Sequence, residues 1–235
     1  MLARPAQRET VEALRQRLQG EAIGSRQAFA SGLCGNLPSE FRRGSLVEFI
    51  AEAGSGATAV ALLTAREACR AGGALVVVDR LRTFYPAAAA LFGVTHETIF
   101  VRPRSRKDEL WALNQTLRCP GVGAAICWLE SVEERAIRGL QVVAEQSGAV
   151  GLFVRPVNVC GRPTWSDVQL RIEAMPSNER QRRLRIEVVR SRSGHAGASA
   201  IVELQDDATT HPAAHLVPVV SQLAAATHAT RSSSA

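Results

Sequence analysis

The chain has 235 residues, with 28 lysines and arginines against 22 aspartates and glutamates, which gives a formal charge of +6 at pH 7. This length suits one α/β domain of ordinary size with appended tails. Aromatic residues make up only 5% of the chain, so single-strand binding through a base-stacking platform is disfavoured. The positive charge favours proximity to a nucleic acid or to an acidic partner.

The cysteines and the N-terminus indicate a cytoplasmic protein. The five cysteines are an odd number without a C-x-x-C pair, which favours reduced thiols in the cytosol. Residues 1–5 do not begin an apolar signal segment, and the chain has no run of about 18 apolar residues that would span a membrane. We therefore expect a soluble cytoplasmic protein without a membrane partner, with association with the nucleoid left open.

Composition divides the chain into three parts. Residues 10–19 place apolar side chains at helical spacing among charges, which predicts an amphipathic helix. We assign residues 1–43 to an N-terminal helical segment and residues 44–206 to a core domain. Residues 207–235 are rich in Ala, Thr, Ser and His and are assigned to a flexible tail.

The core domain alternates apolar strands with helical stretches. The expected strands are 46–50, 74–79, 99–102, 124–129 and 150–155, and the expected helices are 58–71, 86–92, 107–117 and 132–145. Continuous apolar strands separated by helices are typical of a parallel sheet covered on both faces. Residues 168–173 and 184–189 instead alternate with period two, which predicts an antiparallel hairpin at the edge of the sheet, followed by a last strand at 200–204.

The first strand of the core leads into a segment that has the layout of a phosphate-binding loop, G-x-x-x-x-G-K-[ST]. Ala51 stands at the first glycine and Ala57 at the lysine. That lysine normally neutralises the charge that builds up in phosphoryl transfer, so we expect very slow hydrolysis, no catalytic residues and no enzyme activity. Backbone N–H groups at the start of the helix still favour an anion. The candidate nucleotide-binding residues of the loop are Gly54, Ser55, Gly56 and Thr58, with weak ATP binding or a simple strand-to-helix turn as the alternatives.

The order of these elements resembles the ATPase core of RecA-type recombinases. Residues 79–94 are similar to that family's second strand and following helix, and Leu81 occupies the position of the glutamate that activates water. Glu130 follows four apolar residues, where the family has its magnesium-associated aspartate, so the resemblance adds Glu130 to the degenerate nucleotide site. The chain leaves little room after residues 131 and 155 for the family's two DNA-contacting loops, which argues against a self-sufficient recombination filament.

Five further strings lie at residues 100–103, 108–118, 123–128, 148–156 and 183–190. They are similar to the ImuA family, RecA-like accessory proteins of bacterial SOS mutagenesis cassettes, within a resemblance that spans about residues 44–204. The resemblance implies a RecA-like fold and a non-catalytic accessory or scaffold protein in SOS-induced translesion DNA synthesis and repair. The implied partners are an inactive Y-family polymerase-like protein, an error-prone replicative polymerase subunit and RecA, with DNA reached through these partners.

Arginines gather where several strands are expected to end. The predicted basic surface for a partner or DNA comprises Arg80, Arg82, Arg102, Arg104, Arg106 and Lys107. The carboxyl ends of parallel strands meet at one edge of a sheet, so these charges are expected to converge there, unless they form a solvated face. Arg190 and Arg192 are added to the predicted basic surface, because they match positions from which RecA subunits extend lysines toward a neighbour's nucleotide. The alternative is a pair of solvated arginines on an edge strand.

Other chemistry has little support in the sequence. His211 and His215 are spaced as metal ligands, but Pro212 lies between them, and we expect no metal site and no other cofactor. Trp111 and Trp128 are expected to pack in the core. Two alternatives to a non-catalytic scaffold stay open: a nucleotide- or DNA-dependent regulatory ATPase of RecA type with an arginine replacing the loop lysine, and a RecA-like structural module without a repair role.

Overall fold

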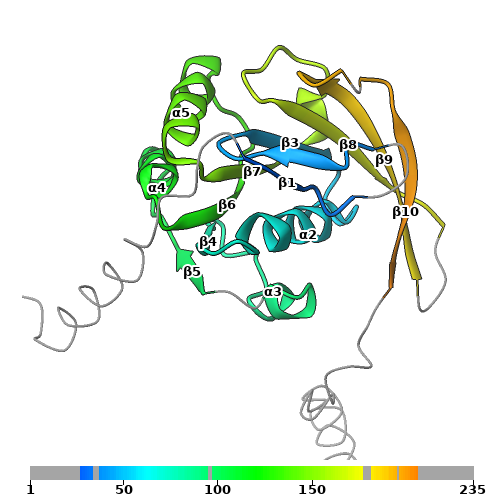
Figure 1. The fold of residues 1–235 in the computed structure, drawn as a ribbon, viewed down its shortest axis with the longest axis horizontal. Coiled ribbons are helices and arrows are strands. Elements are labelled where there is room, and N and C mark those ends of the chain that lie inside the picture. Colours follow the sequence, from blue (N-terminus) through cyan, green and yellow to red (C-terminus); the bar gives the residue numbers. More distant parts are fainter. Residues whose placement is uncertain (1–26, 34–36, 95–96, 177–180, 195, 206–235) are drawn as a thin grey trace, which may run out of the picture. The chain divides into compact units, whose positions relative to one another are not determined.

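An eight-stranded sheet in the order β10-β9-β8-β3-β7-β6-β4-β5 organises the protein (Figure 1). The structure is a computed structural model and describes residues 27–33, 37–94, 97–176, 181–194 and 196–205. Its strands are β1 (Ala28–Ala30), β2 (Glu40–Arg42), β3 (Leu46–Ala51), β4 (Ala74–Val78), β5 (Thr98–Val101), β6 (Val122–Trp128), β7 (Val150–Arg155), β8 (Val168–Ala174), β9 (Gln181–Ser191) and β10 (Ser199–Gln205). Its helices are α2 (Ala57–Cys69), α3 (Ala87–Leu91), α4 (Arg106–Arg118), α5 (Glu134–Ser147) and the short 3-10 helix η1 (Val157–Val159).

Strand direction follows the hydrophobic pattern of the sequence. The strands from β5 to β8 are parallel neighbours, whereas β8 with β9 and β9 with β10 pair antiparallel. All residues of β3 and β4 are buried, as continuous apolar strands of a covered parallel sheet should be. The predicted mostly parallel α/β sheet with an antiparallel hairpin is therefore confirmed.

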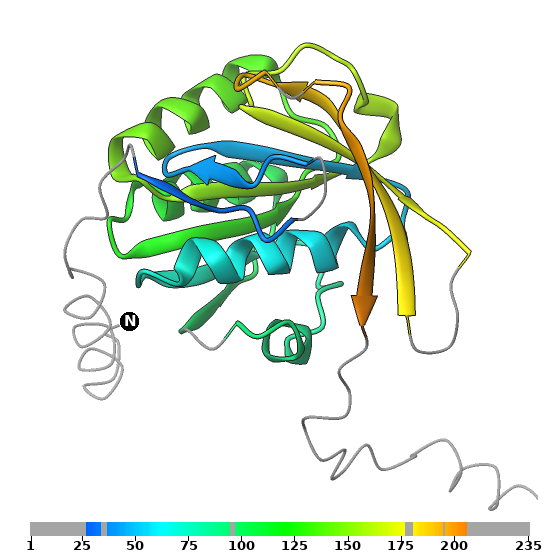
Figure 2. The ribbon, with the colours of Figure 1, turned by 45° about the vertical axis from the view of Figure 1, so that its right-hand side comes forward.

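Helices cover both faces of the sheet. α2 and α3 contribute to a core on one face that includes Val60, Leu62 and Ala89, while α4 and α5 contribute to a separate core on the other face that includes Leu113 and Ile137. Figure 2 shows α2 and α5 on opposite sides of the central strands. The protein is thus a three-layer α/β/α arrangement in which β3 lies near the middle of the sheet.

A small hairpin made by β1 and β2 covers α2 from outside. The Phe29 and Phe41 rings meet edge to face at a centroid distance of 6.2 Å, and the Thr64 hydroxyl of α2 donates to the Ser31 carbonyl at 2.9 Å. This cover explains why α2 is buried nearly all round, since a helix exposed on one side would carry a polar stripe. The hairpin lies within residues 1–43, for which only helix was predicted; the predicted helix at 10–19 and the predicted tail at 207–235 lie outside the described residues.

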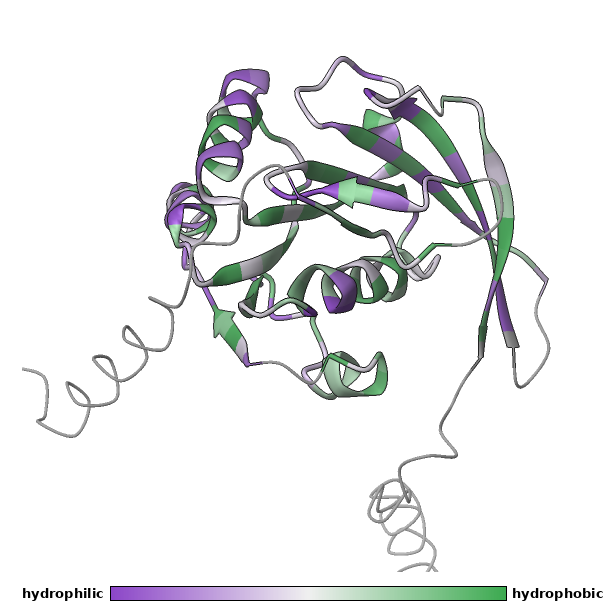
Figure 3. Cartoon of the chain, in the orientation of Figure 1, coloured by the Kyte–Doolittle hydropathy of each residue, from purple (hydrophilic) through white to green (hydrophobic). Residues whose placement is uncertain are grey.

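The hydropathy of the helices matches their positions. Figure 3 shows hydrophobic residues along the central strands and alternating hydrophilic and hydrophobic positions on α5. The buried stripe of α5 includes Ile137, Leu140 and Ala144, and its outer side is mostly polar but also exposes Val142. Within the described residues, no helix combines the length and the apolar character needed to cross a bilayer.

Candidate functional site

The loop between β3 and α2 keeps the backbone shape of a tight glycine turn. Gly54 and Gly56 have φ of 82° and 91°, in the left-handed region that favours glycine. The Ser55 hydroxyl donates to the Glu52 carbonyl at 2.8 Å, and the Ser55 N–H donates to the same oxygen at 3.2 Å. Ser55 therefore closes the turn upon itself, and its hydroxyl is already engaged within the loop.

Apolar side chains occupy the space beside this loop. Ala57, at the lysine position, is 5% exposed and belongs to the apolar core on the α2 face. A Cβ atom added to Gly56 would lie 2.9 Å from Leu184 Cδ2 of β9, so Leu184 packs directly against the turn. A lysine at position 57 would have to displace core packing before its ammonium reached solvent. Thr58 is half-buried and Gly54 is exposed, so the outer part of the loop alone faces solvent.

The segment after β4 is held by an aspartate and lacks a base. Asp79 accepts hydrogen bonds from the Thr83 N–H at 3.2 Å and the Phe84 N–H at 2.9 Å, which fixes the turn that follows the strand. Leu81, at the position of the expected glutamate, is exposed. A leucine side chain neither accepts a proton nor orients water, so this position offers no general base.

Glu130 is bound by arginines of the predicted basic surface. Its carboxylate lies 3.9 Å from Arg80 Nη2 and 3.7 Å from Arg106 Nη2. Arg80 Nε also donates to the Glu109 carboxylate at 3.3 Å, and Glu109 is buried. Burial raises the pKa of the Glu109 carboxyl, and the Arg80 guanidinium opposes that rise. These contacts bring the ends of β4 and β6 and the start of α4 together. The two carboxylates also offset the positive charges of Arg80 and Arg106, which a nucleotide or DNA would otherwise contact.

Of the six cations predicted at the carboxyl edge of the sheet, four remain outside this network. Arg82, Arg102, Arg104 and Lys107 are exposed. Arg82 is also the one described non-glycine residue with positive φ, at 58°. Glu130 follows β6, two strands from β3, or roughly 10 Å across the sheet. The edge therefore carries positive charge near β4 and β5, at some distance from the loop after β3.

Arg190 of β9 and Arg192, which follows the strand, bind a segment of their own chain. Arg190 Nη1 donates to the Thr164 carbonyl at 2.7 Å, and Arg192 Nη2 donates to the Trp165 carbonyl at 2.8 Å. Arg192 also lies 3.2 Å from Asp167, whose other carboxylate oxygen accepts the Leu46 N–H at 3.0 Å. Burial raises the pKa of Asp167, opposed by the Leu46 N–H and by Arg192. The structure thus places both arginines as anchors between β9 and the segment ahead of β8.

A buried carboxylate that the sequence analysis did not single out joins three strands. Glu48 of β3 is fully buried and accepts from Arg155 Nη1 of β7 at 2.8 Å, from the Thr164 hydroxyl at 3.0 Å and from Gln169 Nε2 of β8 at 2.7 Å. A cavity of about 150 Å³ beside this network is lined by residues that include Arg155, Thr164 and Gln169. A glutamate inside an apolar strand, with an arginine ending a second strand, is the signal from which this network was predictable.

The connections after β6 and β7 are short or folded. Residues 129–133 join β6 directly to α5, and residues 156–167 contain η1 and the buried residues Thr164 and Ser166. Neither connection is a long exposed loop, as the sequence predicts for segments that take the place of the recombinase DNA loops.

Of the two predictions that a tryptophan packs in the core, one is confirmed and one is wrong. Trp128 packs against the core on the α2 face, with its ring 5.6 Å from Phe84, so its prediction is confirmed. The prediction for Trp111 is wrong, because this side chain is 66% exposed on α4. Its neighbours Leu113 and Leu117 face the core while Trp111 projects outward.

Metal ligands do not gather in the part of the chain that the structure covers, where no group of three or more His, Cys, Asp or Glu side chains is found. His211 and His215 lie outside the described residues. No protein-family model matches the chain, and no curated protein is significantly similar to it in sequence.

Proposed function

We propose that this protein is a non-catalytic RecA-like accessory or scaffold protein in SOS-induced translesion DNA synthesis and repair. It works in the cytoplasm through protein contacts, with RecA, an inactive Y-family polymerase-like protein and an error-prone replicative polymerase subunit as partners. The strings that resemble the ImuA family and the RecA core lie between residues 44 and 204, the part of the chain that forms the eight-stranded sheet.

One observation carries the proposal. The loop after β3 keeps two left-handed glycines, but Ala57 lies in the apolar core and Leu184 packs against Gly56. A phosphoryl-transfer site needs a cation and an oriented nucleophile at this place, because nearly all of its catalysis is positioning and charge stabilisation. Here the loop supports the packing of β9 and α2, which favours a retained fold whose function resides in its surfaces.

The alternative of an ATPase with a substitute arginine has less support. Arg80 and Arg106 are the arginines nearest Glu130, and both form ion pairs with carboxylates. Arg80 would have to leave Glu109 and Glu130 to reach a phosphate, and Arg106 would have to leave Glu130. The exposed Arg82, Arg102 and Arg104 follow β4 and β5, three and four strands from β3, or roughly 14 to 19 Å across the sheet.

Nucleotide binding and turnover test the proposal. Purified protein is titrated with a fluorescent ATP analogue, and phosphate release is followed with and without single-stranded DNA. We expect no turnover in either case. Phosphate release above the buffer control that Ser55→Glu abolishes would contradict it.

A pair of variants separates site binding from general charge effects. Ser55→Glu places a carboxylate on the candidate loop, and Ser39→Glu makes the same charge change on the exposed turn before β2. Binding that is lost only in Ser55→Glu would identify a nucleotide-gated adaptor. Pull-down of purified RecA and of the two polymerase proteins then tests the partners directly.

A further inference from the structure

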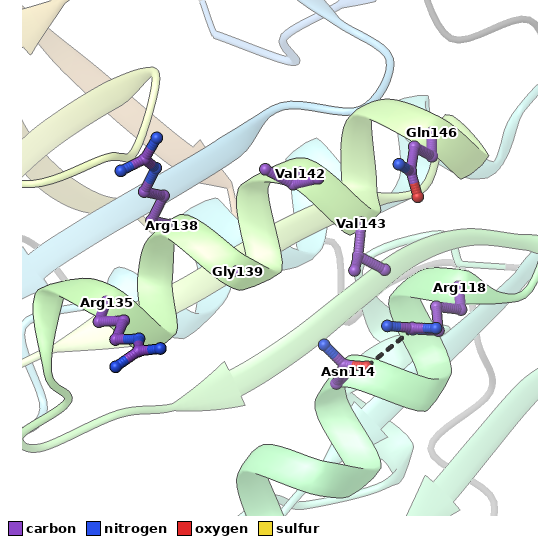
Figure 4. Close-up of a pocket in the computed structure, with 8 residues that line it drawn as sticks. All are labelled: Asn114, Arg118, Arg135, Arg138, Gly139, Val142, Val143 and Gln146. Atoms are coloured by element: carbon purple, nitrogen blue, oxygen red, sulfur yellow. Dashed lines mark hydrogen bonds between the residues drawn. The ribbon is translucent and has the colours of Figure 1, made fainter.

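A groove between α4 and α5 is open on the face of the protein opposite α2. Its volume is about 510 Å³, and it is lined by Asn114, Arg118, Arg135, Arg138, Gly139, Val142, Val143 and Gln146. Figure 4 shows Asn114 and Arg118 of α4 across from Val143 of α5, with Gly139 between Arg135 and Val142. A Cβ atom added to Gly139 would meet nothing within 4 Å, so the missing side chain keeps this part of the groove open.

The groove has an apolar centre. Val142 is 46% exposed at its edge, and Val143 forms part of its wall. Trp111 lies seven residues before Arg118, two turns along the same side of α4, and its exposed ring therefore extends this surface along the helix. An exposed tryptophan and valine beside an open groove are typical of a surface that another chain covers.

The rim of the groove is positive. Arg118, Arg135 and Arg138 line it, and none of the lining residues is acidic. Among the residues that the structure describes, no carboxylate lies within ion-pair distance of these three arginines; Arg118 Nε donates to Asn114, and Arg138 lies 4.7 Å from the Trp165 ring centroid. This contrasts with Arg80 and Arg106 at the edge of the sheet, which do have carboxylate partners.

We propose that this groove binds an acidic amphipathic helix of a partner protein. Two neighbouring helices leave a trough that suits a third helix, the apolar side of which covers Val142, Val143 and Trp111. Glutamates and aspartates on its flanks pair with Arg118, Arg135 and Arg138. The proposal rests on the proposed scaffold function for its biological meaning, and it assigns that function a docking face and a partner chemistry.

Nucleic acid fits the groove less well. Single-stranded binding needs open aromatic faces along a basic track, but the centre here is aliphatic, and Arg138 lies over the Trp165 ring. Trp111 is the one aromatic side chain that we place along the groove.

The test uses a fluorescein-labelled synthetic peptide with leucines at i, i+3, i+4 and i+7 and glutamates between them. A second peptide has the same composition with its leucines dispersed, so it has equal charge and no apolar side. Fluorescence anisotropy with the full chain should show binding of the first peptide at least about tenfold tighter than binding of the second. Equal binding of the two peptides would overturn the proposal, since charge alone would then account for it.

Two matched pairs of variants locate the site. Gly139→Tyr fills the groove and should weaken binding at least about tenfold, whereas Gly139→Ala should change it less than about twofold. Both replace a helix-interior glycine with a better helix former, so the fold should be retained. Arg118→Glu with Arg135→Glu should also abolish binding, while Arg42→Glu with Arg185→Glu, an equal charge change at exposed positions on β2 and β9, should not.

Three further results would overturn the proposal. They are tighter binding of labelled single-stranded DNA that Gly139→Tyr abolishes, self-association of the chain that the same variant abolishes, and equal peptide binding by Gly139→Tyr and Gly139→Ala. The peptide assay contains no nucleotide. Its failure would refute the groove as a docking site for an acidic helix and would leave the ATP test of the proposed function unaffected.

Discussion

Replacing Arg155 with methionine removes the cation from the buried network that joins β3, β7 and β8. Glu48 is fully buried, and the Arg155 guanidinium, 2.8 Å away, is its one charged partner in this network. In the variant, the carboxylate keeps only the neutral donors Thr164 and Gln169. Breaking a buried pair by removing one partner costs about 3–5 kcal/mol of unfolding free energy, because a charge remains in a poorly solvated place.

For a domain of this size, 1 kcal/mol shifts the melting temperature by roughly 2–4 °C, so Arg155→Met should lower it by about 6–20 °C. The assay is thermal unfolding followed by far-UV circular dichroism. Arg171→Met is the matched control, since it removes a half-exposed arginine from the surface ion pair with Glu173, and such pairs contribute little. Adding Glu48→Gln to Arg155→Met should recover most of the loss. Equal melting temperatures for Arg155→Met and Arg171→Met would refute the reasoning.

Three other predictions concern the loop, the thiols and the pH dependence of stability. Ala57→Lys should lower stability by about 1–3 kcal/mol through overpacking and should produce no phosphate release; measurable turnover would contradict it. Burial raises the pKa of Cys69 to about 12 and also raises the pKa of Cys127, so both thiols should resist a thiol reagent at pH 8 until the protein is unfolded. Rapid reaction of either thiol in the native protein would contradict the fold. Burial raises the pKa of the Asp167 carboxyl above that of an ordinary aspartate, so the wild type should lose stability relative to Asp167→Asn as pH rises from the ordinary value through the folded-state pKa. Urea titrations at several pH values measure this difference, and an unchanged difference would contradict the burial of this carboxyl.

The parallel core was predictable because its central strands are almost entirely apolar, with Glu48 in β3 and Arg155 in β7 as the charged exceptions. The apolar runs of β3, β4, β6 and β7 predict burial on both faces of the sheet. The period-two alternation of β8 and β9 predicts that these two strands pair antiparallel, as they do. The β1 and β2 strands were missed because each has three residues, and their pairing depends on packing against α2 rather than on a local turn signal.

The burial of Trp111 was wrongly predicted because the whole apolar run of α4 was treated as one buried face. The residue stands within an apolar run, but helical geometry turns each position by about 100° from the one before. Leu113 and Leu117 share the buried stripe of α4, whereas Trp111 lies on the same side as Arg118 and faces solvent. A residue-by-residue helical projection would have placed it outside the core.

The ion pairs and hydrogen bonds of the charged side chains could not be predicted from the sequence. Arg80 follows β4 and Arg106 begins α4, and only the fold shows that Glu109 and Glu130 lie beside them. Arg190 and Arg192 likewise bind backbone carbonyls far from them in the chain. Ion pairing and anchoring depend on distances between loops, which a residue pattern does not contain.

The most direct test of the central claim is ATP turnover by the purified wild-type protein, measured as phosphate release with and without single-stranded DNA. With Ala57 in the core after β3 and Leu81 in place of a base after β4, the protein should give no turnover above the buffer control in either condition. DNA-stimulated phosphate release that Ser55→Glu abolishes and Ser39→Glu preserves would show that this loop performs the chemistry, and would contradict the account.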